Sequence, residues 1–179
     1  MTEKTMVQKL QKNVLVQMNE YFKEDRIAAT LDTVEDGLVT DVLSALYPHF
    51  SEADLEVLAE FYFLPQEAKE QEVMYFVASL TLQEDIPQER ITEVSAGAAM
   101  VDALLATGGF MVDREHRTLI YRLAVPILAS LSYEKVLTEV DAIIQNARNA
   151  AMRHSGNLMK LVQAEISVDD YITKITSVA

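Results

Sequence analysis

The chain contains no cysteine among its 179 residues. This absence excludes disulfide bonds, thiolate nucleophiles and cysteine-ligated zinc or iron sites. A protein without thiols suits a reducing compartment, so we expect it in the cytoplasm. The N-terminal segment MTEKTMVQKLQKNVLVQMNEYF mixes charged and amide side chains with apolar ones, which is not the pattern of a secretory signal peptide.

Long apolar runs and basic residues are also scarce. Asp102 interrupts the alanine-rich segment and Arg122 interrupts a later apolar segment, so we expect no membrane span. The 15 Lys and Arg residues face 28 Asp and Glu residues, which gives a net charge of −13. Lys69 is the single basic residue between Arg26 and Arg90. Such a surface repels a phosphate backbone, so nucleic acid is not expected as a partner.

The sequence shows no motif for catalysis or ligand binding. Its five glycines form no phosphate loop, because the pair at 108–109 follows the expected helix, whereas anion binding requires a loop that precedes one. The histidines at 49, 116 and 154 lie too far apart for a metal motif; we expect His116 in a turn and His154 at a helix end. No Gly-x-Ser-x-Gly motif is present. We therefore expect a non-enzymatic protein with no catalytic residue, no metal and no cofactor.

Hydrophobic residues make up 50% of the chain. This content and the length predict a single domain over residues 1–179. Two segments alternate apolar and polar side chains at period two, LEVLAEFYFL at 55–64 and VMYFVASLTL at 73–82, which predicts two strands. The segment LVTDVLSALYPHF at 38–50 fits a helix or a strand by periodicity. We predict that residues 38–82 are mostly strand, with DTVEDG at 32–37 as a turn and PQEAKEQE at 65–72 as an exposed connection.

Three helices are expected around these strands. Apolar residues at spacings of three and four predict an N-terminal helix over 3–25. A middle helix should begin near Pro87 and run to about Ala106, and Gly108 should end it with a positive φ. Ser132 is placed to cap a long helix that HSGN at 154–157 should break or kink, and SVDD at 167–170 resembles a capping box for a short last helix.

The stretch GGFMVDREHRTLIYRLAVPI at 108–127 reads as a β-hairpin. FMVD and TLIYRLAVPI are its strands, residues 114–117 form its polar turn, and Pro126 should end the second strand. The expected fold class is therefore α+β: an antiparallel sheet of about five strands packed with an N-terminal helix, a middle helix and a long C-terminal helix.

The hairpin also carries a family resemblance. The residues that carry it are those of the helix start IPQER upstream and, in the hairpin segment, Gly108, Phe110, Asp113, Tyr121, Arg122 and Pro126. This pattern resembles the type III secretion chaperone-like superfamily, in particular its YbjN-type bacterial members, over about residues 73–145. Asp102 and Ala106 stand where that pattern has an asparagine and a proline. The resemblance implies a non-enzymatic α+β domain, often dimeric, that binds another protein.

One predicted surface is too apolar for contact with water alone. The second face of the sheet would carry Leu58, Tyr62, Tyr75 and Ile120, which we predict as partner-binding residues, beside Val73 and Val77. The chain's own first or last helix, a partner protein or a second copy of the chain could cover this face. The expected function is a protein-binding or chaperone-like module. The alternative is an enzyme or small-ligand protein with a pocket between the sheet and the long helix.

Overall fold

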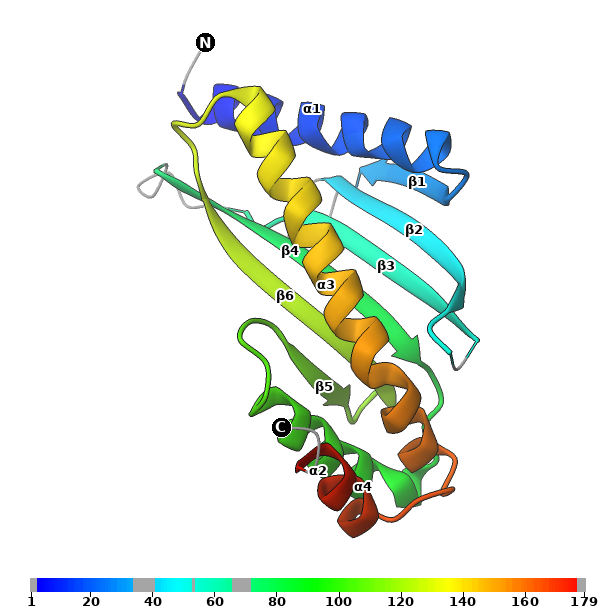
Figure 1. Cartoon of the computed structure of the whole chain (residues 1–179). Helices are drawn as coiled ribbons and strands as arrows, with labels where there is room; N and C mark the ends of the chain where they lie inside the picture. Colours follow the sequence, from blue (N-terminus) through cyan, green and yellow to red (C-terminus); the bar gives the residue numbers. More distant parts are fainter. Residues whose placement is uncertain (1–2, 34–40, 53, 66–71, 177–179) are drawn as a thin grey trace. The chain divides into compact units, whose positions relative to one another are not determined.

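The computed structural model describes residues 3–33, 41–52, 54–65 and 72–176. The described residues form a six-stranded antiparallel sheet with the order β1-β2-β3-β4-β6-β5 and four α-helices (Figure 1). Along the chain the elements are α1 (Glu3–Glu24), β1 (Ala28–Thr33), β2 (Asp41–Phe50), β3 (Leu55–Phe63), β4 (Val73–Gln83), the 3-10 turn η1 (Gln88–Arg90), α2 (Ile91–Asp102), β5 (Gly109–Asp113), β6 (Thr118–Leu128), α3 (Tyr133–Val162) and α4 (Val168–Thr176). The predicted α+β class is confirmed.

The chain is divided into two compact units, and each collects three separate segments. Unit 1 comprises Met1–Tyr47, Leu58–Ala78 and Ala124–Asn146, and unit 2 comprises Pro48–Val57, Ser79–Leu123 and Ala147–Ala179. Four of the strands and α3 therefore contribute one part to each unit. The single domain expected from the sequence stays a prediction, and the two units are described separately here.

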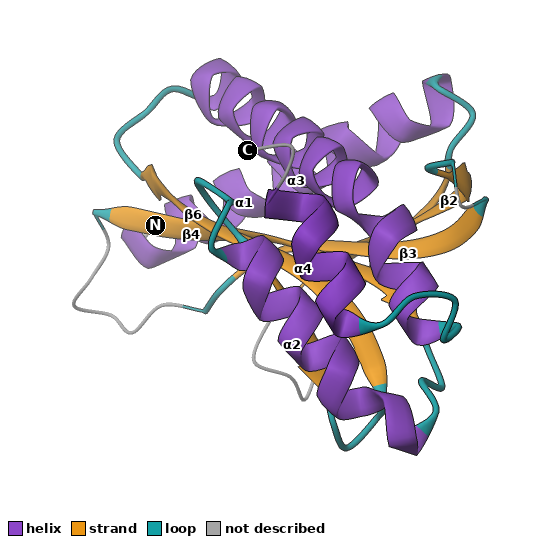
Figure 2. Ribbon diagram, turned by 60° about the horizontal axis from the view of Figure 1, so that its bottom comes forward, coloured by secondary structure: helices purple, strands orange, loops and turns teal. Residues whose placement is uncertain are grey.

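Unit 1 is built around aromatic rings on one face of the sheet. Phe61, Phe63 and Phe76 are buried on β3 and β4 at alternate positions, which confirms the period-two prediction. The ring of Phe22, on α1, lies 6.2 Å from that of Tyr47 and 5.6 Å from that of Phe61. These contacts hold α1 against this face, which we call the inner face. Figure 1 and Figure 2 show the part of α3 that belongs to unit 1, up to Asn146, lying over one side of the strands of that unit.

Unit 2 joins the β5–β6 hairpin to three helical segments. Phe110 and Tyr121 are opposite each other in the hairpin and both are buried, with their rings 4.9 Å apart. α2 contacts both β5 and α4. Gly97, in α2, is needed because a Cβ there would collide with the Leu161 side chain and lie 3.3 Å from the Tyr171 ring.

Several local predictions are confirmed and others are wrong. The helix over 3–25, the strands within 38–82 and the hairpin turn at 114–117 are confirmed. The sequence missed β1, which includes Asp32 and Thr33 of the predicted turn, whereas 34–37 and most of the 65–72 connection lie outside the described residues. The capping box at the start of α4 is confirmed, since Ser167 Oγ accepts the Asp170 N–H at 3.1 Å.

Three predicted breaks are absent or displaced. Gly108 has the predicted positive φ of +71°, but α2 already ends at Asp102 and Gly108 lies in the connection to β5. Pro126 does not end β6, because β5 pairs with β6 only as far as Arg122 and so requires no N–H beyond that point. The segment 154–157 does not break α3, which continues to Val162 with Ser155 and Leu158 buried.

Asp102 offers a test of the α2–β5 connection through its charge. Its Oδ1 accepts the backbone N–H of Phe110 at 2.7 Å. Burial raises the pKa of the Asp102 carboxyl, although this hydrogen bond opposes the shift. A carboxyl whose pKa is higher in the folded chain than in the unfolded chain stabilises the fold while it is protonated, below its unfolded-state pKa. This stabilisation is lost as the pH rises through its folded-state pKa. We therefore expect Asp102→Asn, which keeps an oxygen acceptor, to gain stability over the natural chain as the pH rises from acid to neutral.

Urea unfolding of both chains across this pH range measures the difference. Asp113→Asn is the matched control, because the hydrogen bond with His116 lowers the pKa of the Asp113 carboxyl. The stabilisation that the Asp113 carboxylate provides is present above its unfolded-state pKa and is lost in acid. Asp113→Asn should therefore lose stability relative to the natural chain as the pH rises. Parallel pH profiles for the two variants would contradict the assignment of Asp102.

Candidate interaction surface

The strand positions of unit 1 that alternate with the buried ones form the opposite side of the sheet, which we call the outer face. In β1 and β2, Leu31 pairs with Leu43, which is fully buried, so this pair belongs to the inner face. The pairs on either side of it, Thr30↔Ser44 and Asp32↔Val42, therefore lie on the outer face. In β3, β4 and β6, the alternating burial of the side chains shows which positions lie on the outer face. The larger apolar members of the outer face are Val42, Leu46, Leu58, Tyr62, Val73, Tyr75, Val77, Pro126 and Leu128.

Three large apolar side chains of the outer face are well exposed: Leu58 at 41%, Tyr75 at 43% and Leu128 at 54%. Backbone hydrogen bonds bring their strands together. The Leu64 N–H donates to the Tyr75 carbonyl at 2.9 Å, and the Ala129 N–H donates to the Glu72 carbonyl at 2.9 Å. The end of β3 and the end of β6 therefore both lie beside the start of β4, which brings Tyr75 and Leu128 close together on the outer face. Leu58 lies on the same face nearer the start of β3, with Glu60 and Tyr62 at the outward positions that follow it.

The predicted partner-binding residues divide between the two units. Leu58, Tyr62 and Tyr75 lie on the outer face of unit 1, with Tyr62 half-buried. Ile120 belongs to unit 2, where it is half-buried opposite Met111, a residue that is 45% exposed. Val77, expected on the same exposed face, is fully buried. Leu128 was missed because Pro126 was expected to end the strand before it.

The first helix does not cover the outer face. The ring of Phe22 contacts Phe61 on the inner face. Lys12 also reaches an inner-face residue, since its Nζ lies 3.6 Å from Asp41 Oδ1. The last helix, α4, contacts α2 within unit 2. Of the possible covers considered for this face, the first helix is therefore excluded.

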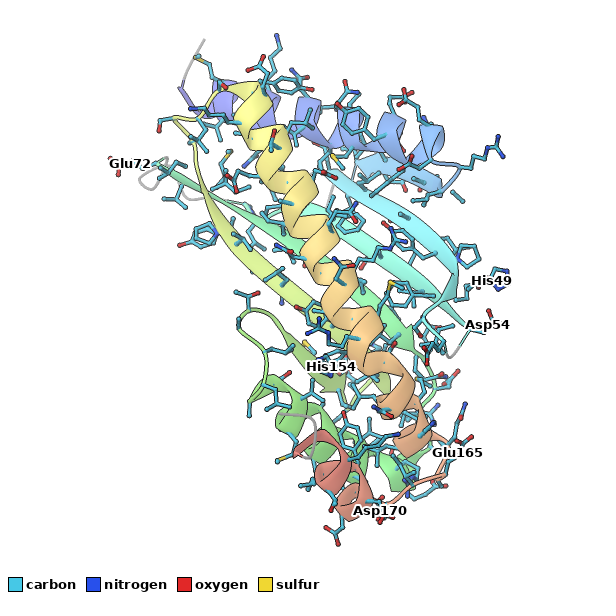
Figure 3. The ribbon with its side chains drawn as sticks, in the orientation of Figure 1. His49, Asp54, Glu72, His154, Glu165 and Asp170 are labelled. Atoms are coloured by element: carbon cyan, nitrogen blue, oxygen red, sulfur yellow. The ribbon has the colours of Figure 1, made fainter. Side chains whose placement is uncertain are left out.

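A hollow of about 660 Å³ adjoins the outer face at Leu128. It lies between the first turns of α1 and the segment that follows β6, and among the described residues that line it Glu72 is the one with a charge. Figure 3 labels Glu72 at the start of β4. The other lining residues are Met6, Val7, Leu10, Leu128, Ala129, Ser130 and Leu131. Leu128 thus belongs to both surfaces and makes them continuous.

The histidines contribute local contacts within unit 2. His49 Nδ1 lies 2.6 Å from Asp54 Oδ1, and Figure 3 shows the pair at the β2–β3 turn. His116 lies in the hairpin turn as predicted, 2.7 Å from Asp113, and this hydrogen bond raises the pKa of the His116 ring. His154 is inside α3 and not at its end; burial lowers the pKa of its imidazole, with a smaller contribution from Arg153.

The described residues contain neither a cluster suited to a metal ion nor a helix that could span a membrane. No group of three or more His, Asp or Glu side chains there is arranged to hold a metal ion. None of the helices in the described ranges combines the length and the apolar character needed to cross a bilayer.

The class defined by unit 1 is thus an antiparallel α+β sheet with α1 on its inner face and apolar side chains exposed on the other. No family model matches the chain, and no curated protein matches it. Among solved structures, the chain is similar to YbjN from E. coli, a protein suggested to be a transcription regulator. Their sequences are 11% identical, the match covers 79% of this chain and 91% of YbjN, and the TM-score is 0.44. It is also similar to an uncharacterized protein from Methanothermobacter thermautotrophicus, at 14% identity over 85% of this chain and 98% of that one, with a TM-score of 0.40.

Proposed function

We propose that the chain is a non-enzymatic protein-binding module that holds another polypeptide on the outer face of unit 1. The observation that carries the proposal is the exposure of Leu58, Tyr75 and Leu128 on adjacent strands of one sheet face. A monomeric protein gains nothing in folding from large apolar side chains left in water, and several of them exposed on one sheet face favour an interaction site there.

The energy available from these three side chains is moderate. Full burial of one large apolar side chain is worth roughly 1.5 to 3 kcal/mol, so covering the exposed part contributes about 1 kcal/mol each. A micromolar complex needs about 8 kcal/mol after the cost of association is met. A partner must therefore also use the hollow beside Leu128, the flanking outer-face residues or the charges around them.

The test is a selection of random peptides displayed on phage against the immobilised chain. We expect enriched peptides that bind the natural chain and lose at least about tenfold in affinity for the double variant Leu58→Asp with Tyr75→Asp. Leu104→Asp is the matched control, because Leu104 is 47% exposed but lies outside the sheet, in the connection after α2.

Circular dichroism establishes that each variant is folded before binding is compared. The proposal fails if no peptide is enriched. It also fails if the enriched peptides bind the folded double variant as well as they bind the natural chain, because their site then lies elsewhere.

A further inference from the structure

The outer face of unit 1 carries negative charge and no positive charge on its strands. Asp32 and Glu60 occupy outward positions of β1 and β3, and Thr30 Oγ1 donates to Asp32 Oδ2 at 3.3 Å on that side. No Lys or Arg occurs within β1, β2 or the parts of β3, β4 and β6 that belong to unit 1. The described basic residues of unit 1 lie in α1, in the turn that follows it and in α3.

The hollow that adjoins this face has the same character. Of the lining side chains that the structure describes, Glu72 alone is charged, and its neighbours are apolar residues and Ser130. A ligand that covers the outer face and enters the hollow therefore meets apolar side chains and carboxylates, and no Lys or Arg among the described lining residues. The ligand that complements this combination is apolar and carries positive charge.

A second copy of the chain does not meet this requirement. Packing two outer faces together would bring the face that carries Asp32 and Glu60 against an identical acidic face. Like charges that meet across an interface oppose its formation, and the strands of this face provide no positive charge to pair with these carboxylates. Face-to-face dimerisation is therefore opposed by charge.

We infer that the occupant of the outer face is a segment of a partner polypeptide in which large apolar side chains are interspersed with Lys or Arg. This inference rests on the proposed function and adds the chemistry of the partner. The apolar side chains would cover Leu58, Tyr75 and Leu128, with the basic groups beside Asp32, Glu60 and Glu72.

Three synthetic peptides of one length test the inference. They share the same leucine positions and carry Lys, Ser or Glu at every other position, and binding to the full chain is measured by fluorescence anisotropy. We expect the Lys peptide to bind about tenfold more tightly than the Ser peptide, the effect of two or three exposed ion pairs. The difference should shrink between about 50 mM and about 500 mM NaCl, because salt screens exposed charges.

Two variants locate the effect. Glu60→Lys should reduce the preference for the Lys peptide, whereas Glu139→Lys should not, because Glu139 is exposed on α3 and the two variants have the same net charge. Leu58→Asp with Tyr75→Asp should weaken the Lys peptide although it adds two negative charges. A merely electrostatic attraction to an acidic protein would instead be strengthened by that double variant, and this outcome would overturn the inference.

The two proposals fail in different ways. Equal binding of the Lys and Ser peptides, both lost in the double variant, would refute the inference about charge and leave the protein-binding function standing. A homodimer that sedimentation detects in the natural chain and not in the folded double variant would also refute it. Failure of the phage selection would remove the proposed function itself.

Discussion

Replacing Phe76 with Ala is expected to cost about 3 to 5 kcal/mol of the free energy of unfolding, the usual cost of removing a buried aromatic ring. Phe76 is fully buried, and its ring centre lies 5.1 Å from that of Phe63 and 6.5 Å from that of Phe61. Its removal leaves a cavity between β3 and β4 and breaks both ring contacts. Because folded domains are stable by only about 5 to 15 kcal/mol, the midpoint of urea unfolding should fall steeply.

Tyr75→Ala is the matched control, since Tyr75 is the preceding residue of β4 and is 43% exposed on the outer face. It should change the free energy of unfolding by about 1 kcal/mol or less, mainly through the lower strand propensity of Ala. Equal losses from the two variants would show that the inner and outer faces have been assigned wrongly. The proposed function adds a contrast, because Tyr75→Ala should weaken peptide binding while the chain stays folded.

Gly108→Val is expected to destabilise unit 2 by about 3 kcal/mol or more. Two costs combine there. The φ of +71° suits glycine and strains a β-branched residue, and a Cβ would collide with the Tyr121 hydroxyl and lie 3.0 Å from the Arg122 carbonyl. Tyr121 would have to move, which breaks the hydrogen bond from its hydroxyl to the Thr107 carbonyl, 3.1 Å long.

Gly156→Ala provides the opposite case for comparison by thermal unfolding. Gly156 lies within α3, and a Cβ there would meet no heavy atom within 4 Å. Alanine should therefore stabilise the helix by about 0.5 to 1 kcal/mol. An unchanged unfolding midpoint for Gly108→Val would contradict the close contact between the α2–β5 connection and Tyr121.

The sequence predicted those elements whose signal is periodic and local. Alternation in 55–64 and 73–82 identified β3 and β4, and with them Leu58, Tyr62 and Tyr75 on the outward positions. The buried stripe of α3 followed in the same way from its spacing, with Val136, Val140, Ile143, Ile144 and Ala147 all buried. Here local preference and tertiary packing agree.

The errors fall where packing decides against a local signal. The glycine and polar residues at 154–157 normally end a helix, yet the buried Ser155 and Leu158 hold this part of α3 in place. Gly108 was expected to end α2, but the side chain of Asp102 accepts the Phe110 N–H, and this contact joins the true helix end to β5. β1 is short and has small side chains, so its strand conformation depends on pairing with β2.

The strand order has a further consequence for recognition. The two outermost strands, β1 and β5, each have a helix against them, α1 in unit 1 and α2 in unit 2. A helix packed beside an edge strand can hinder the addition of another strand, which is one way in which domains prevent edge-to-edge aggregation. A polypeptide held on the outer face would then gain few main-chain hydrogen bonds from the sheet, and contacts between side chains would have to fix its position. Recognition by side chains alone tolerates sliding and many different sequences, which favours brief contacts with a range of partners over one permanent complex.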